Sequence, residues 1–454
     1  MVVKYKDKTQ SLPLISAFDL PIIGTTYQMT DPRTLETGIT AIMEKMIGIN
    51  KSIGYLADHG TPSLGQNRMA MMQGGQPGRM QVFHQLLSSR YDIKPVSLED
   101  NGDIPQGLNC LIIVKPTQKF SEYELFQIDQ ALMRGTNIAF FGDAFEEIMP
   151  RGGMGMPQFP VIDTGLAKLF THYGISMKPA YVLDTSSYKH NPGQAQGGGQ
   201  QDIYFAPVIK EKTINLTPPY MKNIKGLVAM QISPLFLEDQ NMDSEKVTAT
   251  RLFSSSKEAW LMQGTINLNP MFLSPPSNKD DFSSYDLSYM LEGTFPSYFA
   301  DKGVPEKSAG EADISETEND SQPRKPAQEI KTSSGTVAEN RLIKTSKPAK
   351  IFFLGCSQML QDNMMDPQGR STNATFILNV LDHLNDEDEI AYLRSKEQSL
   401  NPVGQLTPLT KTLIKGWNIA ILPCFTAILG LAVWIRRNAR KKAITKMFSD
   451  ENFE

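Results

Sequence analysis

An aspartate, a histidine and a serine lie close together in the stretch GYLADHGTPS, where Asp58 and His59 are adjacent and Ser63 follows. Hydrolases combine these residue types for nucleophilic catalysis, with the carboxylate orienting the imidazole and the imidazole accepting the serine proton. Adjacent residues of an extended chain point to opposite sides, so we expect that Asp58 does not orient His59. A turn explains the stretch better, because Gly60 supplies a positive φ and Pro62 fixes the next φ. We therefore interpret Asp58, His59 and Ser63 as a strand-end loop that contacts a ligand or partner.

Two other places carry reactive side chains. Asp143 follows the apolar run IAFFG and is close to Glu146 and Glu147, but a solvated helix start explains these glutamates as well as a paired-carboxylate site does. Cys356 lies on a strand-to-helix turn, where nucleophiles of α/β hydrolases are found. The second glycine of such a turn is missing, and His383 lies about three helical turns away, near the opposite edge of the sheet. We expect Cys356 to be an ordinary buried thiol, and Asp143 and Glu146 to belong to a second contact loop.

Several classes of function are not indicated. The chain has neither a GxxxxGK[ST] motif nor a GxGxxG turn between strand and helix. Its three cysteines, Cys110, Cys356 and Cys424, are far apart and form no CxxC pair, so neither a disulfide framework nor a zinc site is expected. The net charge of −4 gives no basic field for nucleic acid. We therefore expect no catalytic residues, no metal, no cofactor and no nucleic-acid partner.

The elements that must position these loops alternate between strands and helices. Apolar runs at 52–57, 109–114, 137–143 and 349–357 predict buried strands, and YDIKPVSL predicts another. Ser121 and Glu124 have the spacing of a capping box and predict a helix that ends at Gly135. Further helices are predicted over 80–87, 163–174 and 376–384. This alternation indicates an α/β fold with a mostly parallel, doubly wound sheet.

Six regions follow from composition and pattern. We expect N-terminal strands and a helix over 1–50, with the helix at 39–47, and an α/β extracytoplasmic domain over 51–300. Residues 301–348 are polar and nearly free of aromatic residues, which predicts a disordered insertion. The final strand and helix of the α/β body follow at 349–400. A transmembrane helix is expected at 416–436 and a basic cytoplasmic tail at 437–454.

The proposed membrane helix has clear flanks. Residues 417–435 carry no charge, and their length is close to the roughly 20 residues that a helix needs to cross the hydrocarbon core. Trp417 and Trp434 lie at its ends, and Arg436 and Arg437 open a basic segment. The positive-inside rule then places the tail in the cytoplasm and the body outside. No export signal is evident at the start of the chain, so an upstream segment is missing from it, another chain supplies that segment, or the protein is tail-anchored with its body in the cytosol. The strong charge bias favours the first two alternatives.

The order of these segments resembles the gliding-motility-type ABC-transporter auxiliary family, the GldG-like proteins. The resemblance runs from about residue 2 to residue 442, and is carried by GYLADHGTPS, by LNCLIIVKPTQKFSEYELFQIDQALMRG, by KIFFLGCSQML and by the membrane helix with its Arg/Lys segment. It implies an α/β domain beside an ABC-2 type permease, with ATP hydrolysed by a separate ABC ATPase subunit. It implies no catalytic residues.

These observations lead to one expected function and two alternatives. We expect a non-enzymatic, single-pass subunit of an ABC export or gliding-motility-like complex in the inner membrane, with a periplasmic body. Gly430 and Ala432 are expected among the small residues that contact the permease. The alternatives are a membrane-anchored, glutaminase-like hydrolase that uses Cys356 or the pair Asp58 and His59, and a stand-alone module that binds carbohydrate or peptide.

Overall fold

The computed structural model describes residues 2–5, 8–11, 14–20, 24–29, 39, 51–65, 80–99, 102–150, 155–190, 201–238, 240, 243, 245–306, 342–397 and 408–450. Two predicted features lie outside these residues: the helix at 39–47 except for residue 39, and residues 307–341 of the insertion. The chain divides into two compact units, Met1–Gln398 and Ser399–Glu454, and each is described by itself.

One half of the central sheet is parallel and is built from the strands that the apolar runs predict. The runs CLIIV and NIAFF are buried on both faces, as uninterrupted apolar strands in the middle of a parallel sheet are expected to be. The spatial order of the strands is β6 (Asp92–Val96), β5 (Ser52–Leu56), β7 (Cys110–Val114), β8 (Asn137–Phe141) and β18 (Ala349–Leu354). Each neighbouring pair in this half is parallel.

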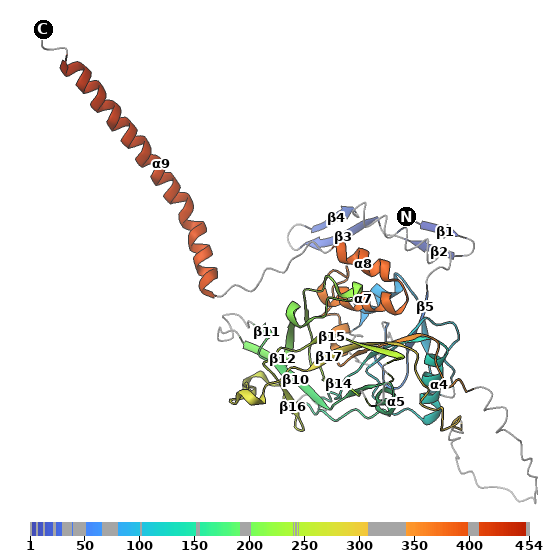
Figure 1. The fold of residues 1–454 in the computed structure, drawn as a ribbon. Coiled ribbons are helices and arrows are strands. Elements are labelled where there is room, and N and C mark those ends of the chain that lie inside the picture. Colours follow the sequence, from blue (N-terminus) through green and yellow to red (C-terminus); the bar gives the residue numbers. More distant parts are fainter. Residues whose placement is uncertain are drawn as a thin grey trace, which may run out of the picture. The chain divides into compact units, whose positions relative to one another are not determined.

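Helices cover both faces of the sheet, so the predicted doubly wound arrangement is confirmed (Figure 1). Alternate strand residues point to opposite faces, and each face packs against its own pair of helices. One face packs against α3 (Gln81–Ser88) and α7 (Thr372–Leu384), and the other against α4 (Glu122–Met133) and α5 (Leu166–His172). The predicted capping box at the start of α4 is present, with Ser121 and Glu124 bonded reciprocally.

The other half of the sheet is antiparallel. Strand β17 (Asp286–Gly293) pairs with β18 from Ser288–Leu354 to Gly293–Ala349, and this pairing joins the two halves. The sheet continues through β14 (Leu235–Leu237) to β9 (Ile175–Met177), and β15 (Val247–Ser254) also pairs with β17. The sheet is therefore mixed, and its parallel half carries the predicted strand-end loops.

Smaller β elements pack beside the sheet. Strands β10 (Ala180–Asp184) and β16 (Ala259–Gln263) form one pair, and β11 (Ser187–His190), β12 (Gln201–Lys210) and β13 (Gly226–Val228) form a three-stranded sheet. A separate apolar cluster joins Phe145, which follows β8, to Tyr181 and Leu183 of β10. This cluster places the small sheets near the carboxyl end of β8.

The remaining short elements of the described residues are two hairpins and five 3₁₀ turns. The hairpins are β1 (Val2–Tyr5) with β2 (Lys8–Ser11), and β3 (Ile15–Leu20) with β4 (Gly24–Met29). The turns are η3 (Glu211–Thr213), η4 (Pro219–Met221), η6 (Pro270–Phe272), η7 (Lys279–Asp281) and η8 (Gln358–Leu360).

A buried ionic cluster fastens α8 (Asp388–Glu397) to the body. Asp382 of α7 is fully buried, and its Oδ2 lies 2.6 Å from Nη2 of Arg394 in α8 and 3.1 Å from Nη1 of Arg90. The hydroxyl of Tyr91 donates to the other carboxylate oxygen at 2.5 Å. Removal of the Asp382 carboxylate would leave Arg394 of α8 largely buried without its counter-charge, which is strongly destabilising.

The flanks of the insertion run side by side. The backbone N–H of Ser297 donates to the carbonyl of Lys344 at 2.9 Å. The side-chain amide of Gln130 in α4 accepts from the N–H of Ile343 at 2.9 Å and donates to its carbonyl at 3.1 Å. The segments that precede and follow the insertion are thus joined to each other, and the second is also joined to α4.

The second unit contains one long helix, α9 (Pro408–Asp450). Residues Thr412–Lys446 are long and apolar enough to make this helix a candidate membrane span. The helix continues through Pro423, which membrane helices tolerate better than soluble ones do.

Candidate functional site

The strand order creates a switch point between β5 and β7. From β5 the chain first passes to β6 on one side of it, and later to β7 on the other side. In open α/β sheets, ligands bind beyond the carboxyl ends of the strands at such a point. The predicted loop with Asp58, His59 and Ser63 follows β5 there, and residues 115–120 follow β7.

Asp58 holds neighbouring loops together. Its Oδ1 lies 2.7 Å from Nδ1 of His59, and its Oδ2 accepts from the hydroxyl of Ser97 and the N–H of Glu99, both at 2.9 Å, and from the N–H of Leu98. Burial alone raises the pKa of a carboxyl group, but here the bond to His59 and the backbone bonds outweigh it and hold the pKa of Asp58 below its ordinary value. The carboxylate therefore stays ionised and is occupied within the fold.

The expectation that Asp58 does not orient His59 is wrong. It assumed an extended backbone, whereas His59 has a φ of 55°, in the left-handed region, which turns its side chain toward that of Asp58. The predicted turn itself is confirmed, since the N–H of Thr61 donates to the carbonyl of Asp58 at 3.1 Å and Gly60 has a φ of 71°. A Cβ at residue 60 would lie 2.1 Å from Oγ1 of Thr117, so this close approach requires glycine.

His59 fills the space at the switch point. Only 3 % of the residue is exposed, and its ring stacks on Phe120 with centroids 3.9 Å apart and planes 1° from parallel. Its Nε2 lies 3.3 Å from Oε2 of Glu124, the same oxygen that accepts from the N–H of Ser121 at the start of α4. The position where an α/β protein commonly binds an anion at a helix N-terminus is thus occupied by the chain's own carboxylate.

Ser63 does not join this arrangement. Its hydroxyl donates to the carbonyl of Gly65 at 3.2 Å, and the side chain is exposed. The contacts found among the described residues around Asp58 and His59 do not include Ser63. The arrangement consequently has the carboxylate and imidazole of a triad, and both are engaged in holding loops.

Asp143 forms a second buried cluster at the next strand ends. Its carboxylate accepts from the backbone N–H and the hydroxyl of Ser357 at 2.6 and 2.7 Å, and lies 3.0 Å from Nζ of Lys115. These contacts join the ends of β7, β8 and β18. Glu146 lies apart from them, since its N–H bonds to the carbonyl of Pro160 at 3.0 Å within a hairpin-like excursion.

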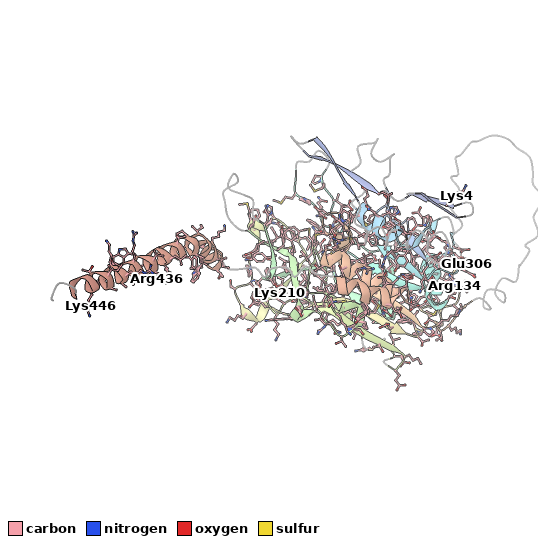
Figure 2. All side chains as sticks on the ribbon, turned by 90° about the horizontal axis from the view of Figure 1, so that it is seen from above. Lys4, Arg134, Lys210, Glu306, Arg436 and Lys446 are labelled. Carbon is pink, nitrogen blue, oxygen red and sulfur yellow. The ribbon has the colours of Figure 1, made fainter. Side chains whose placement is uncertain are left out.

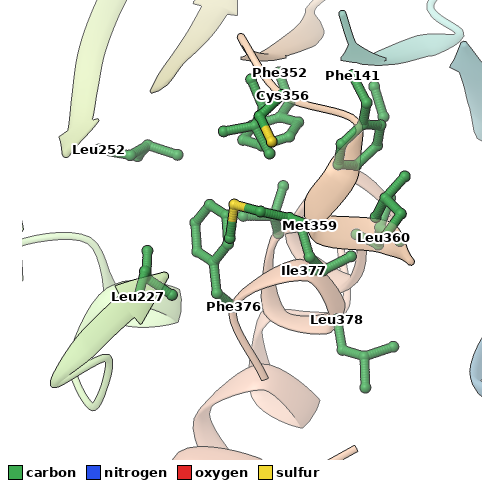
Figure 3. Packing of buried hydrophobic residues seen from close by; sticks show 14 of the residues in the cluster. Phe141, Leu227, Leu252, Phe352, Cys356, Met359, Leu360, Phe376, Ile377 and Leu378 are labelled. Carbon is green, nitrogen blue, oxygen red and sulfur yellow. The ribbon is translucent and has the colours of Figure 1, made fainter. Parts of the chain in front are cut away.

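Cys356 is a buried core residue (Figure 3). It packs among Phe352, Met359 and Phe376, and its Sγ donates to the carbonyl of Met230 at 3.0 Å. Burial and the nearby charge of Asp143 raise the pKa of its thiol to about 12, so the reactive thiolate is disfavoured.

His383 lies at the opposite edge of the sheet, as predicted. Its Nε2 is 3.0 Å from Glu292, which pairs with Lys350 near the start of β18, and its Nδ1 is 2.6 Å from Asp388. The ring also stacks on Tyr220, with centroids 4.1 Å apart. It therefore cannot serve Cys356 as a base.

Sequence reasoning missed Lys115 and Gln231. Both have left-handed backbones, with φ of 39° and 56°, and both lie near the carboxyl edge of the parallel strands. Gln231 accepts a hydrogen bond from Gln358 at 3.0 Å, and both side chains are buried. A positive φ at a lysine or glutamine has no local sequence signal, so no pattern could have identified them.

The predicted anchor residues belong to the second unit. Trp417 and Trp434 are exposed on α9 by 69 % and 61 %, and Arg436 and Arg437 are also exposed. Within the described part of the chain, no three His, Cys, Asp or Glu side chains are grouped so that they could hold a metal ion.

Comparison with known proteins identifies a family. No curated protein matches the chain. Among the solved structures that match, one titled mmIFT52 N-terminal domain is 13 % identical, with a TM-score of 0.38, and covers 74 % of this chain and 97 % of that one. A family model described as "ABC-type uncharacterized transport system" matches residues 50–380, well over half of the sequence. The chain therefore belongs to this family of auxiliary components of ABC-type transport systems.

Proposed function

We propose that this protein is a non-enzymatic, membrane-anchored subunit of an ABC-type export or gliding-motility-like complex. Family membership supports a transport role. One observation supports a non-enzymatic role: the reactive side chains at the strand ends are occupied by contacts within the fold. Asp58, His59 and Asp143 are each bonded to other residues of the chain, and Cys356 is buried. A general base or nucleophile must come within hydrogen-bond reach of its substrate, and these side chains expose almost none of their surface.

We propose further that α9 anchors the chain in the inner membrane and that the body lies in the periplasm. The charge distribution supports this orientation, because Arg436, Arg437, Arg440, Lys441 and Lys442 follow the apolar stretch, while Lys411 and Lys415 precede it.

The permease would pack on the small-residue side of α9. With 100° per residue, Gly416, Ala420, Ala427 and Gly430 project within an arc of about 80°. Small residues along one side let membrane helices approach closely. Ala432, which was expected at this contact, lies about 160° around the helix from Gly430 and therefore on the other side of α9.

The strand-end loops would contact cargo or a periplasmic partner through their exposed residues. Ala57, Gly60, Ser63 and Glu147 are exposed, whereas Asp58, His59 and Asp143 would shape the loops from inside. Ser63→Arg and Glu147→Lys test this role, since neither side chain supports the buried clusters. Intact complex assembly and transport in both variants would remove these loops from the proposal.

Affinity purification of the full chain from gentle detergent tests the subunit proposal. Co-purification of an ABC ATPase and an ABC-2 type permease is expected, and Gly416→Leu with Gly430→Leu should reduce it, while Ala432→Leu serves as the matched control. Purification of the chain alone would favour a stand-alone binding module. An activity that Cys356→Ala abolishes would favour the hydrolase alternative.

A further inference from the structure

Basic side chains surround α9 directly after its apolar stretch. Residues 436–442 include Arg436, Arg437, Arg440, Lys441 and Lys442, all exposed, and residues 408–446 contain no Asp or Glu. Figure 2 labels Arg436, the first of these residues, on α9. At 100° per residue, the five side chains point in directions of about 0, 100, 40, 140 and 240°, so the widest gap around the helix is about 120°. We call these five residues the basic collar.

The position and height of the basic collar match the headgroup layer of one leaflet. The uncharged residues 417–435 span about 28 Å at 1.5 Å per residue, against a hydrocarbon core of about 30 Å. Six further steps from residue 436 to residue 442 rise about 9 Å, while each headgroup layer is roughly 5–8 Å thick. The basic collar thus begins where the hydrocarbon ends and covers the layer that carries the phosphates.

We propose that the basic collar binds anionic phospholipid headgroups of the leaflet that it faces. This inference rests on the proposed membrane anchoring of α9. A docked protein covers one side of a helix, whereas lipids surround it, and charges on nearly all sides fit the lipids better. Arginine and lysine next to a membrane span are attracted by anionic headgroups, and salt weakens this attraction.

Tryptophan quenching by brominated lipids measures which lipid touches the helix at this end. Trp434 lies two residues before Arg436 and is exposed, so it reports on the adjacent lipids. The full chain with Trp260→Phe and Trp417→Phe, which keeps Trp434 as its sole tryptophan, is reconstituted into phosphatidylcholine with a fixed fraction of phosphatidylglycerol. Either the phosphatidylglycerol or an equal amount of phosphatidylcholine is brominated. Quenching by the brominated phosphatidylglycerol should be about two- to fivefold stronger, and 0.5 M salt should reduce the difference.

Charge removal tests the residues themselves. The triple variant Arg440→Gln, Lys441→Gln, Lys442→Gln keeps the first two arginines, and should lose most of the preference for phosphatidylglycerol. Lys411→Gln with Lys415→Gln removes charge before the apolar stretch and should leave the preference at Trp434 unchanged.

The possible results distinguish lipid binding by the basic collar from membrane anchoring of α9. Equal quenching by both brominated lipids would overturn the basic collar as a lipid site, while still showing that the helix is in the bilayer. Absence of quenching by either lipid would overturn the membrane anchoring itself. Loss of a co-purifying ATPase in the triple variant, together with equal quenching, would assign the basic collar to a protein partner and reject the lipid proposal.

Discussion

Replacement of His59 by alanine tests whether this side chain stabilises the loop at the switch point or instead contacts a partner or ligand. The change removes the ring stacked on Phe120 and the contacts of Nδ1 with Asp58 and of Nε2 with Glu124. Asp58 retains its bonds to the loop after β6, and Glu124 retains its bonds to Ser121. The perturbation is therefore confined to the imidazole.

The expected destabilisation follows from the interactions that the imidazole makes. An aromatic pair contributes about 0.5–1.5 kcal/mol beyond its buried area, and a hydrogen bond to a charged group about 1.5–3 kcal/mol. The contact with Glu124 is long, at 3.3 Å, so we count it as weak. The free energy of unfolding should fall by about 2–4 kcal/mol in His59→Ala. His59→Phe keeps a ring over Phe120 and should recover part of this loss, about 1 kcal/mol.

Thermal unfolding of the full chain in detergent, followed by near-ultraviolet circular dichroism, measures the change in the body. A loss of about 2–4 kcal/mol corresponds to a decrease in Tm of roughly 3–6 °C for a body of this size. His190→Ala removes an exposed histidine of β11 and should leave the Tm unchanged. A Tm of His59→Ala within about 1 °C of the wild-type value, combined with loss of transport, would refute the reasoning and show that His59 acts on a partner or ligand.

Three further predictions concern buried or paired groups. Cys356 should resist a small apolar maleimide at neutral pH until the body unfolds, while the same reagent, which can enter a detergent micelle, should reach Cys424 on α9. The hydrogen bond from His383 has the largest effect on the pKa of Glu292. It lowers this pKa below its ordinary 4.5, although burial of the carboxyl group acts in the opposite direction. Its stabilisation is therefore present above about pH 4.5 and lost as the pH falls through the folded-state pKa, so Glu292→Gln should flatten the decline in Tm below that pH. Asp382→Asn leaves two arginines without their counter-charge and should destabilise the body by about 3–5 kcal/mol.

Each of these predictions has a control and a contrary result. Cys424→Ser should abolish labelling of the folded chain; labelling that persists in Cys424→Ser and disappears when Cys356→Ala is added would mean that Cys356 is accessible. An unchanged pH profile in Glu292→Gln would show that the contact with His383 is not maintained in solution. Asp386→Asn, which removes an exposed partner of Lys350, should cost less than about 1 kcal/mol, and an equal loss in Asp382→Asn would contradict the buried cluster.

Local patterns predicted the parallel half of the fold well. CLIIV and NIAFF are apolar on both faces because helices cover both sides of the sheet, and this requirement is visible in the residues themselves. The capping box at Ser121 and Glu124 satisfies helix donors within four residues, so it too is a local signal.

Features set by distant pairing were not predictable in the same way. The antiparallel direction of β17 against β18 depends on a partner that lies across the insertion, and no residue of either strand encodes it alone. His59 was placed on the correct loop, but its contacts depend on a left-handed φ, which no neighbouring residue signals. The link from Asp143 to Ser357 joins residues 214 positions apart, and local patterns identified only the first of them.

The joined flanks of the insertion have a consequence for how this sequence can change. Because Ser297 bonds to Lys344 and Gln130 bonds to Ile343, the segments on the two sides of the insertion stay together whatever lies between them. The entropy of closing a loop rises only slowly with its length, so lengthening or shortening residues 307–341 should cost the body little. Evolution can therefore vary this segment while the domain stays intact, and an experimenter can insert an epitope tag there with little risk to folding.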